Sequence, residues 1–128
     1  MFHKNKLHKN KQETGSLGEN LAVKHLVKHG YRVLARNFRK PWGEIDIIAL
    51  KANVLTFIEV KTLTTNNIFK PEDHFTFHKT KRLLRTCRLC AESLRQNIPW
   101  QIDLIAIELN PDGSVNEIRH IKGIETEK

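Results

Sequence analysis

Two apolar stretches of the sequence carry charged side chains at positions where a buried strand would normally be uncharged. Residues 43–48 read Gly-Glu-Ile-Asp-Ile-Ile, and residues 57–61 read Phe-Ile-Glu-Val-Lys. Short apolar runs of this kind are typical of strands in the interior of a sheet. An ionised group inside a protein is strongly unfavourable unless it is paired or binds a metal. Any fold of this chain must therefore accommodate Asp46, Glu59 and Lys61, and their presence needs a reason.

The link between these two strands predicts how their charges face one another. Strands over residues 44–51 and 54–61 leave a loop of two residues, which indicates a tight hairpin. In that register Asp46 lies directly opposite Glu59, with Cβ atoms about 4.5–5.5 Å apart. Lys61 shares their face because side chains alternate along a strand. A longer loop would shift the register and separate the two carboxylates, so the prediction depends on this hairpin.

Facing carboxylates suggest a magnesium site. Mg²⁺ prefers hard oxygen ligands, keeps several waters, and is usually held by one or two carboxylates together with phosphate oxygens of a substrate. Asp46, Glu59 and the backbone carbonyl of Val60 would supply such a partial shell for Mg²⁺ or Mn²⁺. The metal would polarise a phosphodiester and promote formation of hydroxide from bound water. Lys61 would position the attacking water or stabilise the negative transition state.

A helix is expected before these strands, over residues 16–29, with Gly30 as its left-handed stop. Ser16 and Glu19 have the spacing of a capping box, in which each side chain satisfies a backbone amide of the other. Glu19 also lies at the edge of the apolar stripe of this helix. Two roles therefore stay open for Glu19, the reciprocal cap and a further carboxylate for the metal site.

A second helix is expected over residues 78–96, with one apolar and one basic face. The apolar stripe consists of Leu83, Cys87, Cys90 and Leu94. The basic residues expected to contact nucleic acid are Lys79, Lys81, Arg85 and Arg88 of this helix, together with Arg36. A solvated charged face is the alternative interpretation of this pattern.

Zinc is a weaker interpretation at two places in the sequence. The candidate ligands are the pair His25 and His29, and the set His74, His78, Cys87 and Cys90. We expect the two cysteines to be small core residues, because they lie within the apolar stripe. Helical histidine pairs without a further ligand are usually surface or rim residues.

The charge balance favours a polyanionic partner. Lys and Arg number 22 against 14 Asp and Glu, which gives a formal net charge of +8. No stretch has the length and hydropathy of a membrane span or a secretory signal, so we expect a cytoplasmic protein with reduced thiols and no membrane partner. Residues 1–13 form a basic segment that we expect to be a flexible arm, serving either to contact phosphates or simply to keep the chain in solution.

The motifs occur in an order that resembles a known family. They are Gly18-Glu19 on the first helix, Gly43-Glu44-Ile45-Asp46, Phe57-Ile58-Glu59-Val60-Lys61, Lys79 at the start of the long helix, and Asp103 in a strand over residues 101–109. Together they look like the YraN family of small, mostly uncharacterised bacterial proteins, over about residues 14–122. That family resembles the restriction-endonuclease-like nucleases and, within them, the archaeal Holliday junction resolvases.

The resemblance implies a fold and a set of roles. The fold would be α/β with a three-layer core, in which helices flank a central mixed five-stranded sheet in the order α-β-β-β-α-β-β, and residues 14–128 would form a single nuclease-like domain. Asp46, Glu59 and Lys61 would be the catalytic acids and lysine, and Glu19 would complete the metal shell. Leu63 and Gln101 stand where the family often carries arginine; these departures concern substrate contacts or structural pairs and leave the implied metal ligands intact. Asp103 interrupts the apolar side of its strand, so it is either a capped strand-end acid, which we favour, or a residue that supports the site.

These observations lead to one main hypothesis and two alternatives. The main hypothesis is a Mg²⁺-dependent endonuclease that acts on DNA, with structured or branched DNA in repair or recombination as the expected substrate. The first alternative is a non-catalytic nucleic-acid-binding protein that retains the nuclease fold, and the second is a scaffold for a protein partner. RNA stays open as a substrate, and a homodimer would suit a symmetric cut of two strands.

Overall fold

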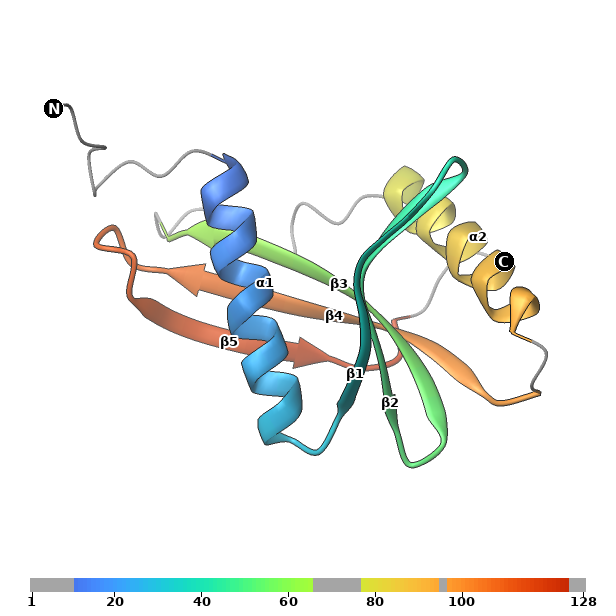
Figure 1. The fold of residues 1–128 in the computed structure, drawn as a ribbon. Helices are drawn as coiled ribbons and strands as arrows, with labels where there is room; N and C mark the ends of the chain where they lie inside the picture. Colours follow the sequence, from blue (N-terminus) through green and yellow to red (C-terminus); the bar gives the residue numbers. More distant parts are fainter. Residues whose placement is uncertain (1–10, 66–76, 95–96, 125–128) are drawn as a thin grey trace, which may run out of the picture.

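The described part of the chain forms five strands and two helices in the predicted order α-β-β-β-α-β-β. The computed structural model describes residues 11–65, 77–94 and 97–124. Its elements are α1 (Lys11–Lys28), β1 (Arg32–Lys40), β2 (Gly43–Lys51), β3 (Val54–Thr64), α2 (Phe77–Ser93), β4 (Trp100–Leu109) and β5 (Val115–Ile121). The sheet lies between the two helices, with α1 on one face and α2 on the other (Figure 1). This is the three-layer α/β arrangement expected of a nuclease-like fold.

The sheet is mixed, and its strands lie in sequence order. Neighbouring strands pair in the order β1-β2-β3-β4-β5. Only β3 and β4 run parallel, while the other pairs are antiparallel. A parallel pair requires a crossover connection, and α2 lies in that connection. The arrangement places β3 at the centre of the sheet, with a hairpin partner on one side and a crossover partner on the other.

The hairpin between β2 and β3 has the predicted loop and register. Lys51 pairs with Val54, and the ladder continues without a shift to Ile47 and Ile58. Ala52 and Asn53 adopt φ angles of 52° and 62°. Positive φ at both loop residues matches the right-handed twist of the flanking strands. The prediction from the two-residue loop is therefore confirmed for this part of the hairpin.

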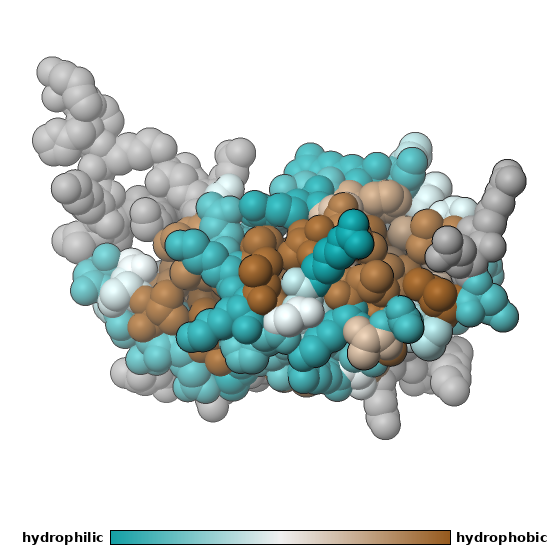
Figure 2. Space-filling view, turned by 60° about the horizontal axis from the view of Figure 1, so that its bottom comes forward, coloured by the Kyte–Doolittle hydropathy of each residue, from teal (hydrophilic) through white to brown (hydrophobic). Residues whose placement is uncertain are grey.

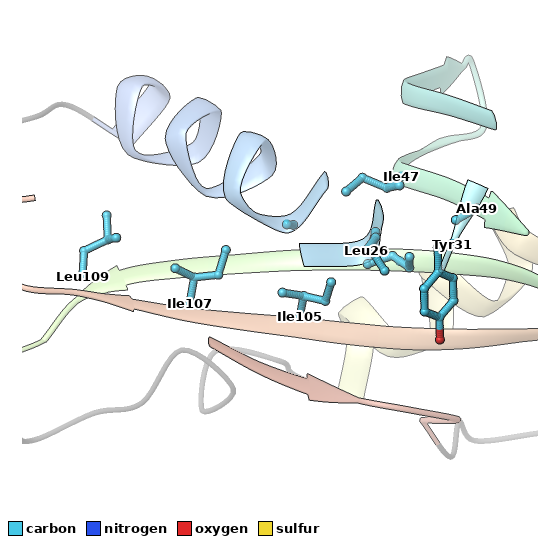
Figure 3. Close-up of a cluster of buried hydrophobic side chains, with 9 residues drawn as sticks. Leu26, Tyr31, Ile47, Ala49, Ile105, Ile107 and Leu109 are labelled. Carbon is cyan, nitrogen blue, oxygen red and sulfur yellow. The ribbon is translucent and has the colours of Figure 1, made fainter. Parts of the chain in front are cut away.

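Each helix covers its own apolar cluster on the sheet. Between α1 and the sheet, the buried side chains of strands and helix point toward one another (Figure 3). This cluster includes Leu26, Tyr31, Ile47, Ala49, Ile105, Ile107 and Leu109. On the opposite face, Phe57 packs beneath α2 together with Cys87 and Cys90, which are buried free thiols. The interpretation of the two cysteines as core residues is confirmed.

Some element boundaries differ from the sequence prediction. The helix α1 begins at Lys11, so Ser16 lies inside it and cannot be its N-terminal cap. The capping-box interpretation is wrong because the same spacing occurs wherever two residues are three apart within a helix. Residues 11–13, expected in the arm, belong to α1, while residues 1–10 lie outside the described part of the chain. Leu94 is 42% exposed because α2 ends at Ser93, one residue earlier.

Apolar side chains also reach the surface at scattered positions. They include Leu34 in β1 and both Val115 and Ile121 in the edge strand β5. Figure 2, which turns the lower side of Figure 1 forward, shows apolar areas separated by hydrophilic side chains. Exposed apolar side chains are normal at the surface of a folded domain. Neither described helix is long and apolar enough to cross a membrane.

Candidate active site

The β1–β2 hairpin bends sharply at one position, where Asp46 lies. Ile47 packs in the cluster under α1, but Ile45 packs in the cluster under α2. Residues two apart in a regular strand share a face, so the strand must turn between these two isoleucines. On the neighbouring strand, Asn37 has a φ of 51° at the same level. The bend carries the end of the hairpin toward α2 (Figure 1).

The same bend separates β2 from β3. Their pairing ends at Ile47 and Ile58, while β3 continues to Thr64 alongside β4. Asp46 therefore does not form the predicted ladder pair with Glu59. Instead the carboxylate of Asp46 accepts a hydrogen bond of 2.8 Å from the amide of Val60. The two strands form a fork, and the acid of β2 satisfies an amide that the backbone of β2 no longer reaches.

The fork opens into a cleft of about 970 Å³. The residues predicted to be catalytic or to bind metal all line it, namely Glu19, Asp46, Glu59, Val60 and Lys61. The cleft thus receives side chains from α1, β2 and β3, which are separated in the sequence. The structure brings the predicted set together, although not by direct opposition of the two acids.

Glu19 reaches the cleft from α1 and is partly withdrawn from water. Its side chain is 17% exposed and lies 4.0 Å from the guanidinium of Arg36. Burial and the nearby Asp46 carboxylate raise the pKa of Glu19, while Arg36 and a hydrogen bond with Asn37 oppose that rise. Arg36, expected to contact nucleic acid, also donates a 2.7 Å hydrogen bond to Asn20. Arg36 therefore links β1 to α1 beside the cleft.

The basic residues are distributed differently from the sequence prediction. Lys81, Arg85 and Arg88 are exposed on α2 but do not line the cleft. Lys79 lies in the first turn of α2, and its side chain lies outside the described residues. Two other cations line the cleft, Lys40 at the end of β1 and Arg82 of α2. The sequence analysis missed both, because their proximity to the site depends on the bend of the hairpin.

The donor atoms at the fork suit Mg²⁺ or Mn²⁺ better than a closed structural site. Within the described ranges, no three His, Cys, Asp or Glu side chains lie close enough together to hold a metal ion, so Glu19, Asp46 and Glu59 line one cleft without forming a three-acid cluster. Asp46 and Glu59 offer carboxylate oxygens from the two sides of the fork. The amide and carbonyl of one strand residue point to the same side, so the carbonyl of Val60 also faces the fork. A partial shell of hard oxygens leaves positions for water and phosphate, as Mg²⁺ requires.

Asp103 is a buried structural acid away from the cleft. Its side chain is fully buried and pairs with Nε2 of His120 at 2.7 Å. It also accepts hydrogen bonds from Gln101 at 2.8 Å and from the amide of Gly123 at 2.9 Å. Burial alone would raise the pKa of Asp103, but these hydrogen bonds outweigh it and hold the pKa below its usual value. Asp103 lies inside β4 rather than at its end, which corrects the expectation from sequence.

Comparison with known proteins identifies the family. The sequence profile of the uncharacterised protein family UPF0102 matches residues 18–107. The chain belongs to this family. It is the YraN family that the motifs resemble, and the matched residues span the acids and the lysine of the cleft.

Relatives from distant bacteria cover most of the chain. A UPF0102 protein of Caldanaerobacter subterraneus is 36% identical over 88% of this chain and 93% of its own length. One from Koribacter versatilis is 41% identical over 77% of this chain and 70% of its own length. One from Clostridium botulinum is 35% identical over 91% of this chain and 96% of its own length. These relatives carry the name of the family alone, so the function must be argued from the cleft.

Proposed function

We propose that this UPF0102 protein is a metal-dependent endonuclease that hydrolyses phosphodiester bonds of DNA, with Mg²⁺ or Mn²⁺ as cofactor. One observation carries the proposal. Asp46, Glu59 and Lys61, from two diverging strands, line a single open cleft. A protein interior tolerates such charges where they are paired or bind a ligand. Two acids and a lysine around an open cleft match the needs of metal-assisted phosphodiester hydrolysis.

The acids of the fork would hold the metal. Asp46 and Glu59, with the carbonyl of Val60, would be its protein ligands, and the metal would polarise the phosphodiester and lower the pKa of a bound water. The hydrogen bond from Val60 fixes the orientation of the Asp46 carboxylate before any ligand binds. Glu19 would contribute a further carboxylate from α1, either to the metal directly or through water.

Lys61 would act on the phosphate group. It lies two residues after Glu59 in β3, so its side chain shares the face of Glu59. An ammonium group there would donate hydrogen bonds to the attacking water or to a phosphate oxygen that gains negative charge.

Cations at the cleft and on α2 would hold the DNA backbone. Lys40 and Arg82 would contact the phosphates nearest the cut, while Lys81, Arg85 and Arg88 would contact DNA outside the cleft. Each neutralised phosphate releases counterions, so binding should weaken as salt increases. The proposed substrate class is structured or branched DNA in repair or recombination. We place this activity in the cytoplasm, and a homodimer would allow paired cuts of two strands.

The second candidate is a nucleic-acid-binding protein without catalysis. The basic side chains of α2 that lie outside the cleft favour it, because they can bind phosphates without the acids. In this alternative Asp46 serves only to satisfy the amide of Val60. The first candidate is preferred because it uses the two acids and the lysine of the cleft together.

A cleavage assay separates these candidates. Linear, flapped and four-way DNAs and a matched RNA are incubated with Mg²⁺ or Mn²⁺, beside the variants Glu59→Gln and Lys61→Met. Glu92→Gln removes an exposed acid of α2 outside the cleft and is the matched control. We expect metal-dependent cleavage that both cleft variants lose and the control keeps. Cleavage that survives both cleft variants refutes the proposal, and salt-sensitive binding without cleavage supports the second candidate.

A further inference from the structure

A glycine immediately before Glu19 allows α1 to lie close against β3. Gly18 is buried, and a Cβ atom at this position would collide with the side chain of Thr62. The Cβ of Thr62 alone would lie 2.9 Å from it. Because that atom is attached directly to the strand backbone, rotation of the side chain cannot remove it. Any side chain at position 18 must therefore move the helix away from the strand.

The contact is steric rather than polar. Within the described part of the chain, Oγ1 of Thr62 is buried without a hydrogen-bond partner. A buried hydroxyl in this state is unfavourable, and glycine within a helix is less favourable than alanine by about 1 kcal/mol. Both residues line or adjoin the cleft, since Thr62 lines it and Gly18 precedes Glu19. Two locally unfavourable choices that meet at one contact suggest that the contact serves the site.

The displacement produced by a methyl group can be worked out from the contact distance. Carbon atoms pack best at about 3.5–4.0 Å, so relief of a 2.9 Å contact requires a movement of about 0.6–1.1 Å. Functional groups must be held to within about 0.5 Å of their productive positions. A misplacement of about 1 Å can lower a catalytic rate by about 100-fold. The expected shift is therefore large enough to affect chemistry.

Glu19 is the residue that such a shift would move. Its carboxylate stands among Asp46, Arg36 and Asn37, all of which come from β1 and β2 rather than from α1. We infer that Gly18 is a positioning residue, which sets the distance from the Glu19 carboxylate to Asp46 through its contact with Thr62. The inference rests on the proposed function, because it concerns a third carboxylate of the proposed metal site.

A second glycine contact on the other wall of the cleft provides a comparison. A Cβ atom on Gly43 would collide with Thr86 of α2, which is 1% exposed. There the threonine hydroxyl donates a 2.9 Å hydrogen bond to the carbonyl of Arg82. This contact places the β1–β2 hairpin against α2 and does not involve α1. Gly18 is thus the glycine whose contact acts on Glu19.

The test exchanges the glycine between the two contacting elements. DNA cleavage is measured against Mg²⁺ concentration for wild type, Gly18→Ala and the double variant Gly18→Ala with Thr62→Gly. Gly15→Ala is the control: Gly15 also lines the cleft, but a methyl group there has nothing within 4 Å and so cannot displace α1. We expect Gly18→Ala to raise the half-saturating Mg²⁺ concentration about 10-fold or more, in line with the loss expected from displacing a ligand. The double variant should recover most of this loss, and Gly15→Ala should match wild type.

Several outcomes decide the inference separately from the proposed function. An unchanged Mg²⁺ requirement in folded Gly18→Ala, or a loss that Thr62→Gly does not relieve, overturns it. If Gly18→Ala fails to fold, Glu19→Asp takes its place, because the shorter side chain withdraws the carboxylate and leaves the contact of Gly18 with Thr62 unchanged. An unchanged Mg²⁺ requirement in Glu19→Asp also overturns the inference. If wild type cleaves no substrate, the proposed function fails. The rise in melting temperature caused by Mn²⁺ then decides. A smaller rise in Gly18→Ala than in wild type supports the inference, and an equal rise overturns it.

Discussion

Replacing Asp103 by asparagine should destabilise the fold strongly, whatever the protein does. Asp103 is fully buried and accepts hydrogen bonds from His120, Gln101 and the amide of Gly123. Asparagine has nearly the same volume, so it leaves no cavity. It removes the charge that pairs with His120, and its amide nitrogen turns one accepting position into a second donor. If the asparagine oxygen keeps Gln101 and Gly123, its amide nitrogen faces Nε2 of His120, which must give up its proton to accept a hydrogen bond.

The magnitude follows from the kinds of bond that are lost. A hydrogen bond to a charged group contributes about 1.5–3 kcal/mol, and a buried donor left unsatisfied costs about 1–3 kcal/mol. Removal of one partner of a buried ion pair typically costs about 3–5 kcal/mol. Because asparagine keeps one acceptor, we expect the free energy of unfolding to fall by about 2–4 kcal/mol. This is a large part of the roughly 5–15 kcal/mol that stabilises a typical domain.

The pH dependence of this loss has a definite direction. The pKa of Asp103 is held below its usual value in the folded protein, so the unfolded chain binds the proton more readily. The contribution of the carboxylate is therefore complete above the unfolded pKa of about 3.9 and is lost as pH falls through the folded pKa. The difference between wild type and Asp103→Asn should shrink as the pH falls below about 4.

Urea unfolding followed by tryptophan fluorescence measures this difference directly. Trp42 and Trp100 both pack against the cluster under α2 and report its unfolding. Glu44→Gln is the control, because Glu44 forms an exposed ion pair with Arg39 and should change stability by less than about 0.5 kcal/mol. A loss below about 0.5 kcal/mol in Asp103→Asn, or a difference that grows toward low pH, would refute the reasoning.

Three further predictions concern the cleft and the hairpin. Asp46→Asn keeps an acceptor for the amide of Val60, so the free energy of unfolding in urea should change by less than about 1 kcal/mol. Metal-dependent cleavage should fall by at least about 100-fold. Retained cleavage would contradict the metal role. Ala52→Gly should stabilise the protein by roughly 0.5 kcal/mol. The left-handed conformation costs alanine about 1–2 kcal/mol, while the greater chain entropy of unfolded glycine costs only about 0.5–1 kcal/mol. A lower free energy of unfolding in urea would count against this account of the turn. Arg82→Ala should lower the slope of log DNA affinity against log salt concentration by about one. Arg36→Ala should change this slope less, because Arg36 donates a hydrogen bond to Asn20 of α1. Equal slopes for both variants would remove Arg82 from the proposed DNA path.

Local signals explain why much of the fold could be predicted from the sequence. The two-residue loop at Ala52 and Asn53 set the register of β2 and β3, and Gly30 marked the end of α1 with a φ of 88°. These features depend on a few neighbouring residues and on the apolar pattern. The motif order then indicated a mixed sheet between two helices, which the structure confirms.

Features that depend on contacts between distant segments could not be predicted. Asn37 has a left-handed backbone, and β2 bends at Asp46. The local sequence is compatible with a regular strand at both positions, so tertiary packing determines the bend. The pairing of Asp103 with His120 joins two strands across a turn, so neither residue alone indicates it. The contact of Arg82 with the cleft likewise required the bend of the hairpin to be known.

The fork gives the two acids unequal weight as indicators of function. At the fork, β2 no longer pairs with β3, and the amide of Val60 would lack a partner if Asp46 did not accept its hydrogen bond. Backbone pairing alone thus accounts for an acid at position 46. Glu59 lies just beyond the last β2–β3 pair and lines the cleft together with Lys61. Glutamine keeps the size of Glu59 and one acceptor oxygen but removes the negative charge that a Mg²⁺ ligand supplies. Glu59→Gln that stays folded therefore tests the metal role directly, with urea unfolding as the measure of its structural effect.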